Sequence, residues 1–372
     1  MKIKGKIIFG FFTLFFILAV QNETILASSG KDSTNNALVF NTSFYAETYY
    51  AKDLIENKNF SRPNFLYNYN STTTFATNLF LVKINLEKKN FRLNFSPMYG
   101  TYSDNNLSNE RGFLKNVFEA NFGYKIFKNK NVWLDAGVLP SHIGFESAVG
   151  ADNLTLTRSV APENSPYYES GIRLSYLNEN EKIYFSFLLL NGWQKIYPKN
   201  FVFEPAIGIQ LTYNYSKTGL INYSNILVQN NSVGIKYFRF FNNLYLKKQF
   251  LQNFSFVAGF DYGMQENVFN NKLDHWLSPQ IVVAYQASST INLALRLENY
   301  TDKNNVVVVP IVVLKTPINI NGISLNSDFR INENFFFRLE AKKLQNSQAI
   351  FGELNTLSKQ NLMFTFSAFY RN

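Results

Sequence analysis

Apolar and polar residues alternate along most of this chain. In the C-terminal segment NLMFTFSAFYRN, Leu362, Phe364 and Phe366 fall on one face. Thr365 and Ser367 fall on the other face. Successive side chains point to opposite faces in a β-strand, whereas a helical face repeats about every 3.6 residues. The segment is therefore predicted to be a strand with one apolar face and one mostly polar face.

The same division recurs along the chain, and several predicted strands carry charge on their polar face. It appears in FRLNFSPMYG, VFEANFGYKIF, INLALRLENY and NFFFRLEAKK. Arg296 and Glu298 share the polar face of the third segment. Arg338 and Glu340 share the polar face of the fourth. The pattern predicts strands that separate water from an apolar environment.

Taken in order, the alternating segments predict about 16 strands, an even number such as single-chain bacterial barrels have. The apolar run from 306 to 317 is assigned to a loop, because prolines interrupt the ladder of a central strand. The predicted strands are 38–50, 75–88, 90–101, 113–127, 131–142, 168–177, 182–193, 204–215, 219–229, 233–247, 252–265, 276–287, 289–300, 319–331, 333–343 and 360–371.

The N-terminal segment resembles a secretory signal peptide. Three lysines lie within the first six residues, an apolar run follows over 7–20, and small residues come next. A transmembrane anchor is the alternative, but the run is shorter than the roughly 20 residues that a spanning helix needs. We expect a signal peptide over residues 1–28 and a β-barrel over residues 29–372.

Composition narrows the possible chemistry. The chain has no cysteine, which excludes a disulfide framework and thiolate metal sites. The net charge of +10 is spread along the chain, which favours a mildly cationic surface or lumen over a nucleic-acid-binding patch. With two histidines far apart and no carboxylates at ligand spacing, we expect neither a metal nor a cofactor.

Three features favour a membrane barrel over a soluble β-sandwich, although both would alternate. The signal peptide exports the chain, the predicted strands reach roughly 10 residues, and the 22 Tyr and 38 Phe residues crowd the strand ends. Short connections such as those around Lys128 and Lys217 also alternate with long ones. The sequence thus predicts an all-β, transmembrane antiparallel barrel in the bacterial outer membrane, in contact with lipid and with small hydrophilic solutes or ions.

The segment from 144 to 171 keeps no period, and it contains charges of both signs and three glycines. A barrel of this size leaves an aqueous channel unless something folds into it. We therefore predict that this long loop folds into the lumen and narrows it, the alternative being an ordinary extracellular loop. The predicted pore-lining residues are Glu146, Asp152, Asn153 and Arg158 of the loop, and Arg92, Arg173, Arg296, Glu298, Arg338 and Glu340 on the polar faces of strands.

Catalysis is not expected. Ser141 stands beside His142 and Asp274 beside His275, but neighbours on a strand point to opposite faces and cannot act together directly. Each histidine is interpreted as a polar residue at the end of a strand, near the membrane interface.

The stretch LDAGVLPSHIGFESAVGADNLTLTRSVAPENSPYYESGIRLSYL, followed by FSFLLLNGW, resembles the OmpL-like β-barrel porin family of Gram-negative outer membranes. Two related triplets, Arg296-Leu297-Glu298 and Arg338-Leu339-Glu340, add to the likeness. The resemblance implies a diffusion porin, without a solute. A barrel that does not conduct, and serves as a surface adhesion or complex-forming protein, is the alternative. The residues that carry the resemblance are Gly137, Pro140, Gly144, Glu146, Asn153, Arg158, Ser159, Pro166, Gly171, Asn191, Gly192 and Trp193.

Overall fold

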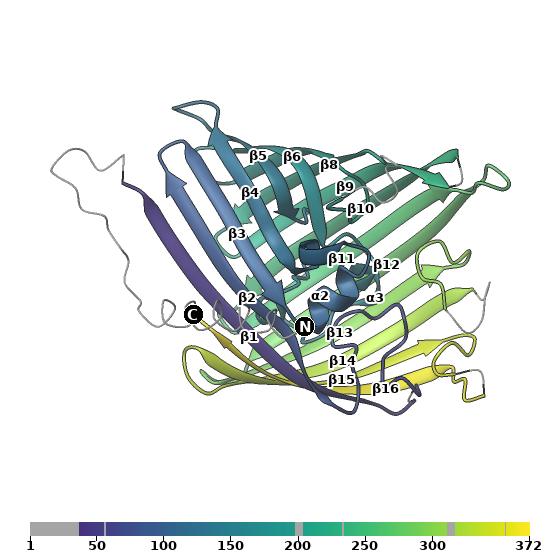
Figure 1. Cartoon of the computed structure of the whole chain (residues 1–372). Helices are drawn as coiled ribbons and strands as arrows, with labels where there is room; N and C mark the ends of the chain where they lie inside the picture. The colour runs from purple at the N-terminus through teal and green to yellow at the C-terminus, as the bar shows by residue number, and fades with distance from the viewer. Residues whose placement is uncertain (1–36, 56, 198–203, 233, 311–316, 354) are drawn as a thin grey trace, which may run out of the picture.

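The computed structural model describes residues 37–372, except 56, 198–203, 233, 311–316 and 354. Within these residues, 16 strands form one closed antiparallel barrel in which every strand pairs with its sequence neighbours and β1 pairs with β16 (Figure 1). The predicted signal peptide lies outside the described residues.

The strands coincide with the predicted segments, with end points that differ by a few residues. The run from 306 to 310 lies outside any strand, as predicted, and 311–316 lies outside the described residues. The strands are β1 Val39–Asp53, β2 Phe75–Lys88, β3 Phe91–Tyr99, β4 Val117–Lys125, β5 Asn131–Pro140, β6 Tyr168–Leu177, β7 Ile183–Leu190, β8 Ala206–Ser216, β9 Gly219–Ser232, β10 Ile235–Phe250, β11 Phe254–Glu266, β12 Leu273–Gln286, β13 Ile291–Asp302, β14 Ile318–Arg330, β15 Phe335–Asn346 and β16 Gln360–Arg371.

The two faces of the barrel wall differ as the alternation predicts. On β13, Leu295 and Leu297 are exposed on the outside, whereas Arg296 and Glu298 between and beside them are buried on the inside. A closed ladder pairs the backbone groups that hydrocarbon would leave unsatisfied, and the outer leucines match lipid. Within the described part of the chain, no helix is long and apolar enough to cross a membrane.

The connections divide the barrel into two unlike ends. At one end, which we call the short-turn mouth, the turns are brief, such as 89–90 and 217–218. At the other end, the long-loop mouth, the connections include 54–74, 100–116 and 141–167. Parts of these three connections pack against inward-facing wall residues inside the barrel.

Short helices form inside the ring of strands. Helices α2 (Thr101–Asn106) and α3 (Val160–Glu163) lie within it (Figure 1), and two 3-10 turns, η1 (Gly112–Asn116) and η2 (Gly150–Asp152), belong to the same loops. Loop side chains, among them Val160, pack with inward-facing wall residues in one buried apolar cluster. Burial of this apolar surface stabilises the loops inside the barrel.

The long loop has different bounds from those predicted. Tyr168–Gly171 belongs to β6, because it pairs in register with Gly137–Pro140 of β5. The connection therefore covers residues 141–167, which we call the lumen loop. The strand predicted over 168–177 is confirmed, whereas the loop predicted over 144–171 overlapped that strand by four residues and began three residues too late.

Candidate pore constriction

The lumen loop crosses the barrel and is bound to the wall opposite its own strands. The backbone N–H of Val160 donates to Glu298 Oε2 on β13 at 2.6 Å. The backbone N–H of Thr157 donates to Glu340 Oε2 on β15 at 2.9 Å. Buried backbone donors need partners, and here inward carboxylates supply them.

Arg296 is the centre of a buried charge network on that wall. Its guanidinium lies 3.3 Å from Glu146 Oε1 of the loop and 3.3 Å from Glu340 Oε1. It lies 3.5 Å from Glu298 Oε1, which also pairs with Lys342 Nζ at 3.2 Å. The structure thus brings four predicted residues together, and three carboxylates share two cations. Removing one member of such a buried cluster leaves another charge without compensation.

Glu146 links the network to the turn that precedes α3. Its carboxylate accepts hydrogen bonds from the backbone N–H of Ser159 at 2.7 Å and from Ser159 Oγ at 2.9 Å. Burial raises the pKa of Glu146 above its ordinary value, and Arg296 opposes this rise only in part. The carboxylate therefore depends on its partners to remain ionised.

Arg158 lies inside the lumen loop and is fully buried. Its Nη2 is 3.1 Å from Glu163 Oε2, and its guanidinium lies 3.3 Å from the centre of the Tyr167 ring. Glu163 also accepts the backbone N–H of Tyr67, in the β1–β2 connection, at 2.9 Å. Arg158 and Glu163 thereby join two loops within the barrel.

The tip of the lumen loop reaches toward the short-turn mouth. Arg338 Nη1 donates to the carbonyl of Gly150 at 2.6 Å, and its Nη2 donates to the carbonyl of Asn153 at 3.0 Å. Asp152 is half-exposed and lies 3.7 Å from Arg371, near the end of β16. Only the outermost charge of the tip therefore contacts solvent freely.

The root of the loop is fixed by His142, which lies just after β5 and is buried. Its Nδ1 is 2.7 Å from Glu169 Oε1, and its Nε2 is 2.8 Å from the carbonyl oxygen of Asn225. Both ring nitrogens face acceptor oxygens, an arrangement that the doubly protonated ring satisfies fully. Burial alone would lower the pKa of His142, but Glu169 and the Asn225 carbonyl together raise it above its ordinary value.

The placement of His142 corrects its interpretation as a strand-end residue near the interface. Its ring also cannot serve Ser141 as a base, because both nitrogens are engaged; Ser141 Oγ itself lies 3.2 Å from the same Glu169 oxygen. His275, in contrast, lies on β12 with Nδ1 2.8 Å from Tyr262 Oη in an exposed contact.

Two glycines allow the strands at this root to approach closely. Gly137 and Gly171 are opposite each other in the β5–β6 register, and both have positive φ, 129° and 156°. A Cβ at Gly171 would collide with the carbonyl of Leu189, and one at Gly137 with that of Ala120. Glycine alone fits such contacts without displacing backbone.

Arg92 and Arg173 lie on the wall formed by β3–β6, away from the network around Arg296. Both pair with Asp135 Oδ2, at 2.7 Å and 3.3 Å. Their side chains are 27% and 18% exposed. Arg92 and the nearby Trp133 line a cavity of about 820 Å³ at the short-turn mouth. Arg92 and Arg173, both predicted to line the pore, therefore contact solvent.

Several residues of the site were not predicted as pore-lining groups. Asp135 and Lys342 alternate with outward residues, and Glu169 has the parity of the inward Arg173 on β6, so strand parity could have placed all three on the inner face. Glu163 lies in the aperiodic loop, where no such signal exists. The pore-lining role of the predicted residues stays a prediction.

The fold is that of outer-membrane porins. The barrel is similar to the anion-selective porin from Comamonas acidovorans, with TM-score 0.63 and 11% identity over 90% of this chain and 100% of that one. It is also similar to the outer membrane channel DcaP of Acinetobacter baumannii, with TM-score 0.61 and 10% identity over 93% and 100%. A third similar structure is Salmonella typhi OmpF in complex with daunomycin, with TM-score 0.54 and 10% identity over 91% and 98%.

The sequence itself matches the family described as "Putative beta-barrel porin-2, OmpL-like" over residues 40–371. The chain belongs to this family and is a β-barrel porin of the bacterial outer membrane, as its sequence resemblance implied. No curated protein matches it. Outer-membrane barrels carry their long loops outside the cell, so the long-loop mouth faces the exterior and the short-turn mouth faces the periplasm.

Proposed function

We propose that small hydrophilic solutes and ions diffuse through this porin along the β2–β6 side of the lumen, past a lumen loop that is fixed to the opposite wall. The contrast in arginine exposure carries the proposal. Arg296 and Arg338 are almost completely buried against the loop, whereas Arg92 and Arg173 keep solvent contact. Charges that touch water are the ones that act on a passing ion.

The charge on that side favours a modest anion preference. Arg92 and Arg173 share Asp135 as their carboxylate partner, so the cluster keeps one net positive charge. On the inner faces of β2 and β4, the cations Lys83 and Lys125 are balanced by the carboxylates Glu87 and Glu119, so the net positive charge of this side is that of the arginine cluster. A positive surface in a narrow, poorly screened lumen raises the local concentration of anions.

The proposal assigns transport by diffusion and no catalytic step. His142, the histidine nearest the constriction, uses both ring nitrogens to anchor the loop. A base positioned beside a nucleophile is therefore not formed at this position.

Single-channel recording tests this function. The mature chain is refolded, inserted into a planar bilayer, and measured in KCl with a salt gradient. We expect stable ohmic steps and a reversal potential of the sign that anion preference gives. Silence from protein shown to be folded would contradict the proposal, and would favour a barrel whose loops close the lumen and bind a partner at the surface.

A further inference from the structure

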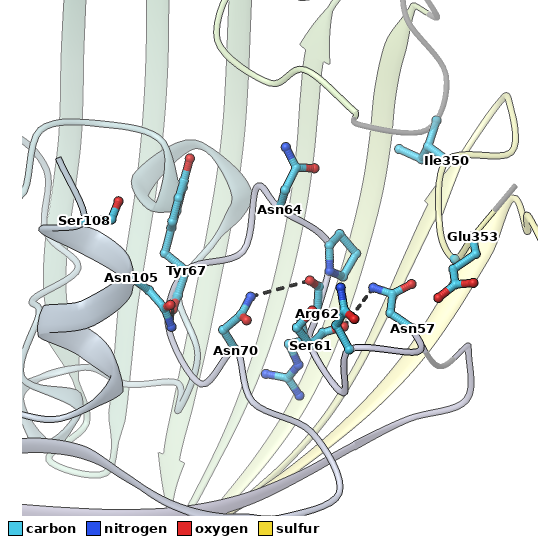
Figure 2. A pocket seen from close by; sticks show the side chains of 13 residues that line it. Asn57, Ser61, Arg62, Asn64, Tyr67, Asn70, Asn105, Ser108, Ile350 and Glu353 are labelled. Carbon is cyan, nitrogen blue, oxygen red and sulfur yellow. Dashed lines mark hydrogen bonds between the residues drawn. The ribbon is translucent and has the colours of Figure 1, made fainter.

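A second cavity lies at the exterior mouth and is distinct from the constriction. Its volume is about 420 Å³, within the range of about 300–1,000 Å³ usual for small-molecule sites. Three connections build it, β1–β2, β3–β4 and β15–β16 (Figure 2). The lining is rich in asparagine and includes one tyrosine: Asn57, Asn59, Asn64, Asn70, Asn105 and Tyr67.

The charged residues around this cavity are already paired. Arg62 is buried and lies 3.1 Å from Asp53 Oδ1. Glu353 lies 3.4 Å from Lys58 Nζ and also accepts the backbone N–H of Lys58 at 2.6 Å. The cavity therefore presents mainly uncharged hydrogen-bonding groups.

Four of the asparagines have their amide groups oriented by backbone carbonyls. In each, Nδ2 donates to a carbonyl of the loops, and Figure 2 shows Asn57 directed at Ser61 and Asn70 directed at the carbonyl of Arg62. Among the described residues, none of the four Oδ1 atoms has a hydrogen-bond partner, so each remains free to accept a hydrogen bond. The pairs are Asn57 with Ser61 at 2.8 Å, Asn64 with Val309 at 2.9 Å, Asn70 with Leu66 at 2.6 Å and Asn105 with Tyr67 at 3.2 Å.

Tyr67 supplies an aromatic ring in the same cavity. Figure 2 shows it standing between Asn105 and Asn64. Its backbone N–H is held by Glu163 Oε2 at 2.9 Å, which ties its position to the lumen loop. Burial, and then Glu163, raise the pKa of Tyr67, so the phenol stays protonated and can donate.

We propose that this cavity binds a neutral saccharide before the solute passes the constriction. Sugar hydroxyls donate to the oriented amide oxygens, and the apolar face of a sugar ring packs on Tyr67. A carboxylate would meet acceptors instead of donors. A metal cation needs oxygens about 2.3–2.6 Å away, a far smaller arrangement than this cavity. The proposal rests on the porin function and names the solute class that it would favour.

Binding can be tested independently of conduction. Maltose binding to the refolded chain in detergent is measured by saturation-transfer NMR, and glucose is compared with glucuronate, which has the same ring and a carboxylate. We expect saturable maltose binding and weaker binding of glucuronate than of glucose. In a bilayer, maltose added on the exterior side should reduce the KCl current saturably.

Three variants locate the site. Tyr67→Ala should raise the maltose Kd about tenfold, since it removes the ring. Asn59→Ala should raise it about threefold by removing an exposed polar group with no hydrogen-bond partner among the described residues. Asn59 holds no loop in place, so this variant remains informative if Tyr67→Ala misfolds. The matched control is Asn270→Ala, an exposed asparagine of the β11–β12 connection, which should leave the Kd unchanged.

Each outcome is decisive. A folded, conducting barrel that does not bind maltose overturns the saccharide site and leaves the porin function standing. Glucuronate bound as tightly as glucose overturns the preference for neutral sugars, and a Kd unaffected by either lining variant overturns the location. Maltose binding to a folded barrel that never conducts supports the site and overturns the proposed diffusion path.

Discussion

Both walls of the lumen carry inward-facing arginines, but the lumen loop covers those of one wall and leaves those of the other in contact with water. On β13 and β15, Arg296 and Arg338 are at most 2% exposed because the lumen loop covers them. On β3 and β6, Arg92 and Arg173 share one carboxylate and keep access to water. All four project inward, so strand parity does not separate them. What lies opposite each arginine decides whether it fixes a loop or faces a solute.

The difference also sets how much each charge contributes to stability. Breaking a buried ion pair by removing one partner costs about 3–5 kcal/mol, whereas an exposed pair contributes about 0–1 kcal/mol. Substitutions on the covered wall should therefore act on the position of the loop, and substitutions on the open wall should act on selectivity.

The largest effect is expected for Arg296→Ala. It leaves Glu146, Glu298 and Glu340 buried with Lys342 as the remaining cation, at a cost of about 3–5 kcal/mol. The strand ladder is untouched, so the loop should detach while the barrel stays folded. Single-channel conductance should rise, and limited proteolysis should cut the lumen loop.

The matched control for that variant is Arg330→Ala. Arg330 is exposed at the end of β14 and donates to the carbonyl of Asn332. It should leave both readouts unchanged. Unaltered conductance and protease resistance in Arg296→Ala would show that the network does not hold the loop.

A smaller, pH-dependent effect is expected at the loop root. The folded-state pKa of His142 is raised. The stabilisation that its charged ring gives to the folded loop is therefore complete below the unfolded-state pKa and is lost as pH rises through the folded-state pKa. Transient blockage of the channel by the loosened loop, recorded as current noise, should become more frequent as the solution becomes alkaline. His142→Gln should remove this pH dependence and cost about 1–3 kcal/mol. Noise that rises identically in the variant would exclude His142 as its source.

On the open wall, Arg173→Gln should change selectivity and little else. It removes one of the two cations that share Asp135, so the reversal potential should move toward cation preference while conductance barely changes. Lys217→Gln, in the exposed turn between β8 and β9, is the charge-matched control. A large change in conductance would mean that Arg173 also holds the loop.

The smallest effect is expected for Asp152→Asn. Asp152 and Arg371 are 3.7 Å apart and both about half exposed, so screening limits the pair to at most about 1 kcal/mol. Protease sensitivity of the loop tip should match that of the unmodified protein at low and high salt. A protease-sensitive loop tip in this variant would instead show that the exposed Asp152–Arg371 pair holds the loop in place.

The barrel could be predicted because its surroundings repeat along every strand. Lipid on one side requires an apolar residue at each second position, and this places Leu295 and Leu297 outside and Arg296 inside. The same rule located the inward charges of β15. The alternation is weakest at Tyr168–Gly171, where loop contacts rather than lipid surround the start of β6 and both Tyr168 and Glu169 are buried.

The partners within the site could not be predicted. Glu146 meets Arg296 150 residues later in the chain, and Thr157 meets Glu340 183 residues later. Both meetings depend on the three-dimensional path of a loop with no period. Parity could place Glu169 on the inner face, but only the path of the loop brings His142 beside it.

The long-range anchors of the lumen loop also order the events of folding. The residues that receive the loop lie on β13 and β15, near the end of the chain, and the loop meets them across the lumen of the closed barrel. Contacts at such separation form late because closing a long segment costs entropy before it is repaid. Maturation of this barrel therefore includes two late, long-range events, the closure of β1 on β16 and the docking of the lumen loop on β13 and β15.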